Sequence, residues 1–201
     1  MVTPTHPLPP IAGTCDPAFS LAQVRAQWGG KAPLWVFAYA SLLWRPEFEV
    51  AEQSLARVQG WHRALQMWSR INRGTPAQPG LVFALLRGGS CWGMVQRVPT
   101  AQANEVLERL WSREMPNGVY EPRWLRCQTE TGPVQALAFT LPTTSPQNTG
   151  RLSMAHYQRI FSDTAGGRFG TTLDYAQQTY ERLLELGIHD QDLADLLQWA
   201  P

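Results

Sequence analysis

Glu114 is the residue whose type fits its position in the sequence least well. Leu107, Leu110 and Trp111 are spaced as i, i+3 and i+4, which predicts the apolar face of a helix. Glu114 is the next position on that face, near the expected carboxyl end of the helix. Burial and the helix dipole both disfavour a carboxylate there, so we expect its pKa to be raised. Such a group can transfer protons near neutral pH, which makes Glu114 a candidate general acid or base.

The same position also has a purely structural interpretation. The helix can fray before Glu114, or the carboxylate can pair with Arg113 or Arg123. Structural ion pairs often place carboxylates beside buried surfaces, and the helical pattern taken alone favours this interpretation.

A second candidate site follows residues 34–39, an apolar segment that predicts a strand buried on both faces. Consecutive backbone amides at the exit of such a strand can form a concavity that binds an anion, for example a substrate carboxylate. The candidate residues are Tyr39, Ala40, Ser41 and Leu42. The alternative, which the pattern alone favours, is that these residues are the end of a strand and part of the core.

Four further side chains have types that could serve a site. Arg73 lies in a turn between two expected strands, where it can clamp a carboxylate or remain a solvated turn residue. Ser41 and Cys91 are potential nucleophiles, but neither has a histidine in its motif, and a buried structural thiol suits Cys91 better. Tyr175 follows Asp174 at an expected helix start and can belong to the core.

The elements that must position these residues are strands followed by helices. Turn signals, among them Gly88-Gly89, bound the expected strands at residues 34–39, 54–69, 81–86, 91–98, 119–128 and 134–141. Helical spacing predicts an inserted helix that Thr100 caps, and further helices at residues 153–161, at 173–187 and after Asp190. We therefore expect an α+β fold, with a mixed, barrel-like β-sheet, an inserted helix and C-terminal helices.

The expected domain organisation is a leader followed by one domain. Residues 1–13 are rich in proline and predict a flexible segment. Asp16-Pro17 then predicts the start of a short helix. We expect residues 1–33 to form an N-terminal leader with this helix, and residues 34–201 to form a single domain that carries the catalytic site.

Charge and hydropathy exclude several classes of partner. The 201 residues include 17 basic and 16 acidic side chains, a net charge of +1, which argues against nucleic acid or an anionic membrane as the main partner. The nine tryptophans leave an RNA-binding module that stacks bases as an alternative, although the chain has no basic stripe. Its apolar segments are shorter than the roughly 20 residues that span a bilayer, and the N-terminus lacks the regions of a signal peptide.

Cysteine and histidine are both sparse and scattered. Cys15, Cys91 and Cys127 are an odd, widely spaced set, which suits a reducing compartment, so we expect a cytoplasmic protein. The four histidines do not have the spacing of metal ligands, so we expect no bound metal.

The order of short motifs along the chain resembles one known family. Residues 37–44, FAYASLLW, resemble the FGYGSLIW signature of the ChaC-like γ-glutamyl cyclotransferases. The other matching segments are Gly60-Trp61, residues 73–76, Pro79-Gly80, residues 89–93, Arg113-Glu114, Tyr120, Gly170 and Asp174-Tyr175, so that the resemblance extends from about residue 34 to about 197. Two family glycines are Ala38 and Ala40 here. Alanine keeps the backbone N–H but does not tolerate a positive φ as glycine does.

The resemblance implies a γ-glutamyl cyclotransferase-like fold and a reaction. Glutathione would be cleaved at its γ-glutamyl amide, giving 5-oxoproline and Cys-Gly by attack of its own α-amine, with Glu114 as the general acid/base. No cofactor or metal is needed for this. The residues implied to bind the substrate are Tyr39, Ala40, Ser41, Leu42, Arg73, Tyr120 and Tyr175. Two alternatives stay open: a cyclotransferase for other γ-glutamyl amines or peptides, and a non-catalytic module that binds γ-glutamyl ligands.

Overall fold

The computed structural model describes residues 15–201, and the flexible leader expected at residues 1–13 lies outside the described residues. The elements in chain order are α1 (Pro17–Trp28), β1 (Trp35–Ala38), the 3-10 turn η1 (Ser41–Leu43), β2 (Glu52–Ser69), β3 (Gly80–Arg97), the 3-10 turn η2 (Thr100–Gln102), α2 (Ala103–Glu114), β4 (Glu121–Thr129), β5 (Gly132–Thr140), α3 (Met154–Phe161), α4 (Thr172–Glu185) and α5 (Gln191–Leu197).

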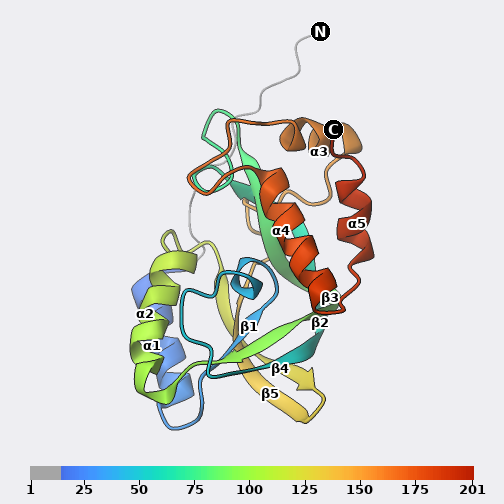
Figure 1. The fold of residues 1–201 in the computed structure, drawn as a ribbon. Coiled ribbons are helices and arrows are strands. Elements are labelled where there is room, and N and C mark those ends of the chain that lie inside the picture. Colours follow the sequence, from blue (N-terminus) through green and yellow to red (C-terminus); the bar gives the residue numbers. More distant parts are fainter. Residues whose placement is uncertain (1–14) are drawn as a thin grey trace.

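The five strands form a closed barrel in the order β1-β3-β2-β4-β5. Neighbouring strands are antiparallel except for β5 and β1, which close the barrel in parallel at Leu137 and Val36. Figure 1 shows α1 and α2 together on one side of the barrel, with α4 and α5 on the other side. The expected α+β fold with a barrel-like sheet is therefore confirmed.

The prediction of two strands at residues 81–86 and 91–98 was wrong, because β3 runs without interruption through the Gly88-Gly89 pair. Both glycines have positive φ, of 102° and 66°, and Gly60 opposite them on β2 has a φ of 77°. The register between β2 and β3 shifts at this point. A pair of strands can bend at such a bulge without ending, and glycine supplies the left-handed backbone that the bulge needs.

Helix starts show where local capping signals succeed. Asp16 caps α1 by accepting from Phe19 N at 2.7 Å, and Asp190 caps α5 by accepting from Leu193 N at 3.0 Å, as predicted. Thr100 does not cap α2. The turn η2 precedes this helix, so that its N-cap position falls on Gln102, which makes no side-chain capping bond.

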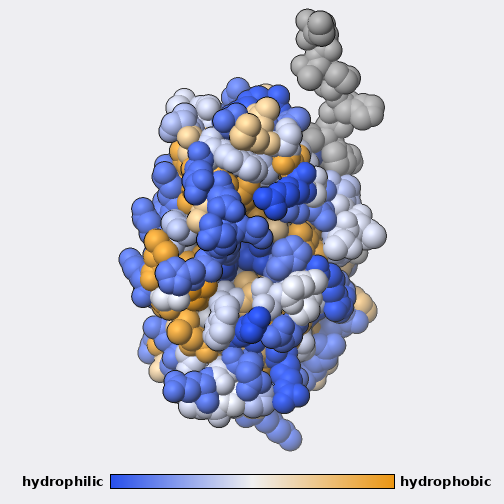
Figure 2. All heavy atoms as spheres, turned by 90° about the vertical axis from the view of Figure 1, so that its right-hand side faces the viewer, coloured by the Kyte–Doolittle hydropathy of each residue, from blue (hydrophilic) through white to orange (hydrophobic). Residues whose placement is uncertain are grey.

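The surface of the molecule is mostly hydrophilic on the face that Figure 2 shows. Hydrophobic side chains gather there in small separate groups. Among the helices of residues 15–201, none combines the length and apolar character needed to cross a membrane.

Candidate active site

A cavity of about 950 Å³ lies where several elements meet. The end of α2, the segment after η1, the turn between β2 and β3, and the loop before α4 all contribute to its lining. The volume is within the range of small-molecule sites. The cavity brings together five residues that the sequence singled out: Ser41, Arg73, Glu114, Tyr120 and Tyr175.

Glu114 is the last residue of α2, so the helix does not fray before it. Leu107, Leu110 and Trp111 are buried on the same face, and the Glu114 side chain is only 17% exposed. This burial raises the pKa of Glu114, and the nearby Glu47 adds to the effect, while Arg113 opposes it. The site thus contains a carboxyl group that is easier to protonate than an ordinary glutamate.

Arg113 joins this carboxylate to the segment after η1. Its Nε lies 2.9 Å from Glu114 Oε1, and its Nη1 lies 3.3 Å from Glu47 Oε2. The same guanidinium donates to Ser41 Oγ at 2.9 Å and to the backbone oxygen of Arg45 at 2.6 Å. The sequence indicates the ion pair between Arg113 and Glu114, but it does not predict the contacts of Arg113 to residues about 70 positions earlier.

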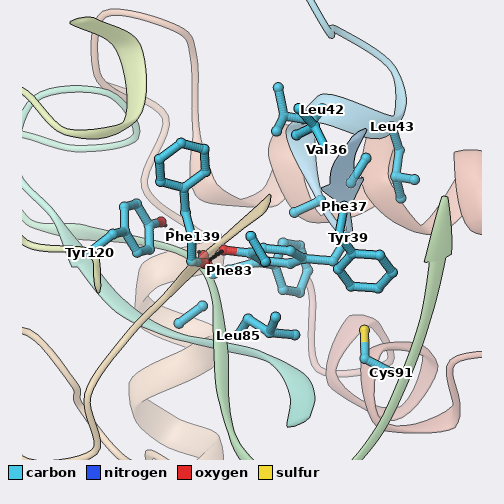
Figure 3. Close-up of a cluster of buried hydrophobic side chains, with 14 of the residues drawn as sticks. Val36, Phe37, Tyr39, Leu42, Leu43, Phe83, Leu85, Cys91, Tyr120 and Phe139 are labelled. Carbon is cyan, nitrogen blue, oxygen red and sulfur yellow. Dashed lines mark hydrogen bonds between the residues drawn. The ribbon is translucent and has the colours of Figure 1, made fainter. Parts of the chain in front are cut away.

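The segment 39–42 leaves β1 beside the cavity, but only Ser41 of its four residues lines it. The Tyr39 side chain points into the buried cluster drawn in Figure 3, where its hydroxyl donates to the Phe139 oxygen at 2.9 Å. Ala40 and Leu42 are buried as well. Leu43 N donates to the Ala40 oxygen at 2.8 Å and so starts η1. The amides of Ser41 and Leu42 come before the amide of Leu43 in the chain, so they are in the position of the N–H groups that have no intrahelical acceptor at a helix start.

The two alanines that replace family glycines fit the backbone. Ala40 has a φ of −145°, and Ala38 is a β1 residue paired with Met94 of β3. Neither has a positive φ, since Glu47 is the one non-glycine with that geometry among the residues described. A Cβ on Gly93 would lie 2.3 Å from the Ala38 oxygen, so glycine is required on β3, the facing strand.

Tyr120 and Tyr175 form an aromatic wall of the cavity. Tyr120 donates its hydroxyl to the Phe83 oxygen at 3.2 Å, and the Tyr175 ring lies 5.3 Å from the Phe83 ring. Burial, with the charge of Glu114 as a second cause, raises the pKa of Tyr175 to about 12 and that of Tyr120 well above its usual value. Both phenols are therefore hydrogen-bond donors at neutral pH.

Arg73 is a buried residue rather than a solvated one. Its Nη1 donates to the Phe169 oxygen, and its guanidinium carbon lies 4.7 Å from the centre of the Tyr175 ring. Burial lowers the pKa of Arg73. The turn is packed so closely against the loop before α4 that a Cβ on Gly167 would lie 2.6 Å from Arg73 N. Asp174, the neighbour of Tyr175, has a capping role, because it forms a capping box with Thr171.

Of the two potential nucleophiles, Ser41 lines the cavity and Cys91 does not. Cys91 is buried, and its thiol lies 3.4 Å from the Trp92 oxygen. Burial raises its pKa, and Figure 3 shows it at the opposite side of the buried cluster from Tyr120. Ser41 does line the cavity, but its hydroxyl oxygen accepts the hydrogen bond from Arg113. Across residues 15–201, no group of three or more His, Cys, Asp or Glu side chains is placed to hold a metal ion.

Solved structures share the closed barrel and helices of this chain, and those it resembles include γ-glutamyl cyclotransferases. The fold matches that of a γ-glutamyl cyclotransferase specific to glutathione from yeast, with a TM-score of 0.75 and 19% identity, over 84% of this chain and 96% of that one. It also matches YkqA from Bacillus subtilis, with a TM-score of 0.57 and 15% identity, over 88% of this chain and 57% of that one.

Sequence comparison identifies the family. The family model described as ChaC-like protein matches residues 34–200. The glutathione-specific γ-glutamylcyclotransferase of Escherichia coli K12 is 34% identical over 181 residues, which cover 90% of this chain and 78% of that protein. Glutathione-specific γ-glutamylcyclotransferase 1 of Mus musculus is 32% identical over 187 residues, which cover 89% and 84%. The chain belongs to the ChaC-like family.

Proposed function

We propose that this protein is a γ-glutamylcyclotransferase that cleaves glutathione to 5-oxoproline and Cys-Gly. Family membership and the activity for which its relatives are named support this proposal. The observation that carries the proposal for this chain is the placement of Glu114, a buried carboxyl group with a raised pKa at the wall of the cavity.

In the proposed mechanism the substrate supplies its own nucleophile. Glu114 accepts a proton from the substrate α-ammonium group, and the free amine attacks the γ-carbonyl carbon to close a five-membered ring. Glu114 gives this proton to the leaving nitrogen as the bond from the γ-carbon to that nitrogen breaks. It then accepts the second proton from the attacking nitrogen, which leaves neutral 5-oxoproline, and passes it on to the amine of Cys-Gly. The reaction is balanced without an enzyme nucleophile, a metal or a cofactor.

The proposed binding mode places the reacting amine next to Glu114. The α-carboxylate is held by the backbone of residues 39–42, a role supported by the position of Ser41 at the cavity and by the helix-start geometry of η1. Arg73, Tyr120 and Tyr175 complete the pocket around the γ-glutamyl group. Holding the amine in a near-attack geometry contributes several kcal/mol to catalysis.

We also propose that the protein acts in the cytoplasm. Cys15, Cys91 and Cys127 are all free thiols, which suits a reducing compartment. Fractionation of cells that produce the protein tests this location, and recovery outside the cytoplasm contradicts it.

The decisive experiment measures 5-oxoproline released from glutathione by the purified protein. The Glu114→Gln variant keeps the shape of the side chain and removes its proton chemistry. Glu181→Gln, an exposed α4 substitution away from the cavity, is the control. We expect release by the wild type and the control only. Near-normal release by Glu114→Gln removes this residue from the mechanism.

Other substrates separate the alternatives. Release of 5-oxoproline from γ-glutamyl amines but not from glutathione indicates a cyclotransferase of different specificity. Thermal stabilisation by glutathione without any turnover indicates a binding module.

A further inference from the structure

Arg70 is a charged residue of the cavity wall that the mechanism above does not use. It directly follows β2, is only 8% exposed and lines the cavity. Its Nη2 atom is buried and has no hydrogen-bond partner within residues 15–201. Removing part of a guanidinium from water without a partner costs free energy, and an anion bound to the guanidinium from the cavity would offset that cost.

The other arginines of the cavity have partners. Arg113 pairs with Glu114 at 2.9 Å, Arg45 with Glu47 at 2.6 Å, and Arg109 with Glu105 at 3.8 Å. Arg73 and Arg168 contact Phe169, the former through its backbone oxygen and the latter across its ring at 5.2 Å. Arg70 therefore differs from the other arginines of the cavity in having a buried guanidinium nitrogen for which residues 15–201 supply no hydrogen-bond partner.

The backbone around Arg70 is held in place before any ligand arrives. Arg168 N donates to the Ile71 oxygen at 2.7 Å, and Phe169 N donates to the Asn72 oxygen at 2.9 Å. Arg73 N donates to Ser69 Oγ at 3.0 Å. These bonds fix the turn on both sides of Arg70, which reduces the entropy lost when a ligand binds there. Arg168, which also lines the cavity, adds a second positive charge to the same wall.

We propose that Arg70 binds the carboxylate at the far end of the leaving group, and so selects γ-glutamyl peptides over γ-glutamyl amines. The inference rests on the proposed function, because it concerns the substrate of that reaction. Glutathione has two carboxylates, and the one beside the reacting amine is assigned above to the backbone of residues 39–42. The glycine carboxylate remains, and a guanidinium is the side chain best suited to bind it through two hydrogen bonds.

The kinetic test compares glutathione with its glycine monoethyl ester, which keeps the reacting groups and removes this one charge. A charged hydrogen bond of ordinary strength predicts a KM about 10 to 100 times higher for the ester with the wild type. In Arg70→Gln the KM for glutathione rises by a similar factor, so that the discrimination between acid and ester is lost. Arg70→Lys keeps the charge and retains part of the discrimination.

A matched substitution controls for the loss of an arginine elsewhere. Arg126 is an exposed residue of β4 outside the cavity, and Arg126→Gln should leave the discrimination intact. The proposal is overturned if the wild type does not distinguish the acid from the ester. It is equally overturned if Arg70→Gln raises the KM for both compounds by the same factor, because Arg70 is then a structural residue.

Binding measurements separate this inference from the proposed function. Calorimetry with the Glu114→Gln protein measures the affinity for glutathione and for the ester without turnover. Turnover by the wild type without any dependence on Arg70 supports the proposed function and overturns this inference. Binding that depends on Arg70 and on the free carboxylate, while the wild type releases no 5-oxoproline, overturns the proposed function and supports this inference. Absence of both binding and turnover overturns both.

Discussion

Arg113 and Glu114 are consecutive residues, and their side chains nevertheless form an ion pair with 2.9 Å between Nε and Oε1. Consecutive residues inside a helix do not face each other. The pair forms here because α2 ends at Glu114, with Met115 in the C-cap position at a φ of −117°. At that end the guanidinium reaches back to Glu114 while its other nitrogens contact Ser41 and Arg45.

Arg113→Gln is expected to shift the pH dependence of the reaction. Burial raises the pKa of Glu114 and the Arg113 charge lowers it, so removing that charge raises the pKa further. The acidic limb of kcat/KM should therefore move to higher pH, with a loss of activity that grows as the pH falls. Arg113→Lys should restore part of the shift, and an unchanged limb would show that Arg113 does not act on the Glu114 proton.

Glu114→Gln should lower kcat by roughly 100-fold to 10,000-fold, the usual contribution of a general acid/base.

The same Glu114→Gln substitution should also stabilise the fold at neutral pH. A carboxyl group with a folded-state pKa above its unfolded value stabilises the protein below the unfolded pKa, and this contribution is lost as pH rises through the folded pKa. Urea denaturation should show that the variant has a higher free energy of unfolding than the wild type at pH 7. This difference between the two proteins should become smaller toward pH 4. Equal differences at both pH values would contradict the raised pKa.

Asp190→Ala should lower the free energy of unfolding by about 3–5 kcal/mol, because it leaves Arg63 buried without its partner and also removes the N-cap of α5. Arg63 Nη2 lies 2.5 Å from Asp190 Oδ2, and the two side chains are 4% and 15% exposed. Denaturant unfolding measures the loss. Asp192, which lies in α5 just after Asp190, is the exposed partner of Arg151. Asp192→Ala should therefore lower the free energy of unfolding by less than about 1 kcal/mol. Similar losses in both variants would show that the burial of Arg63 is not the cause.

Gly167→Ala should damage the cavity as well as the fold. The new Cβ would lie 2.6 Å from backbone atoms of residues 72–74, so the turn that carries Arg73 must move, at a cost of about 1–3 kcal/mol. The KM for glutathione should rise. Gly30→Ala, at a φ of 70° with no atom within 4 Å of the new Cβ, loses about 1–2 kcal/mol from backbone strain alone. An unchanged KM in Gly167→Ala would show that the close packing at Gly167 is not needed for substrate binding.

The spacing of apolar residues was sufficient to predict most helices and strands and the unusual position of Glu114, because these features depend on nearby residues in the sequence. The continuity of β3 was not predictable in the same way. A Gly-Gly pair ends many strands, whereas here Gly60 lies opposite the pair and the register between β2 and β3 shifts without a break. Capping at Thr100 failed for a similar reason, since the turn η2 moved the start of α2.

Tertiary contacts account for the parts of the site that the sequence did not reveal. Arg63 on β2 donates to the Tyr39 oxygen at 2.8 Å and thereby holds the exit of β1, but its position in a strand carries no local signal. The same holds for Arg70, whose missing partner is visible only when the surrounding loops are in place. Of residues 39–42, the sequence did not show that only Ser41 would reach the cavity wall.

Closure of the barrel has a consequence for the order in which the protein folds during synthesis. The pairing that closes the barrel joins Val36 to Leu137, so β1 has no partner before β3 is synthesised and a neighbour on only one side until β5 follows. Pairings so distant in sequence form slowly. We therefore expect the turn after β1, which carries Ser41, to become ordered late, and a nascent chain that stops before β5 to be vulnerable to proteases.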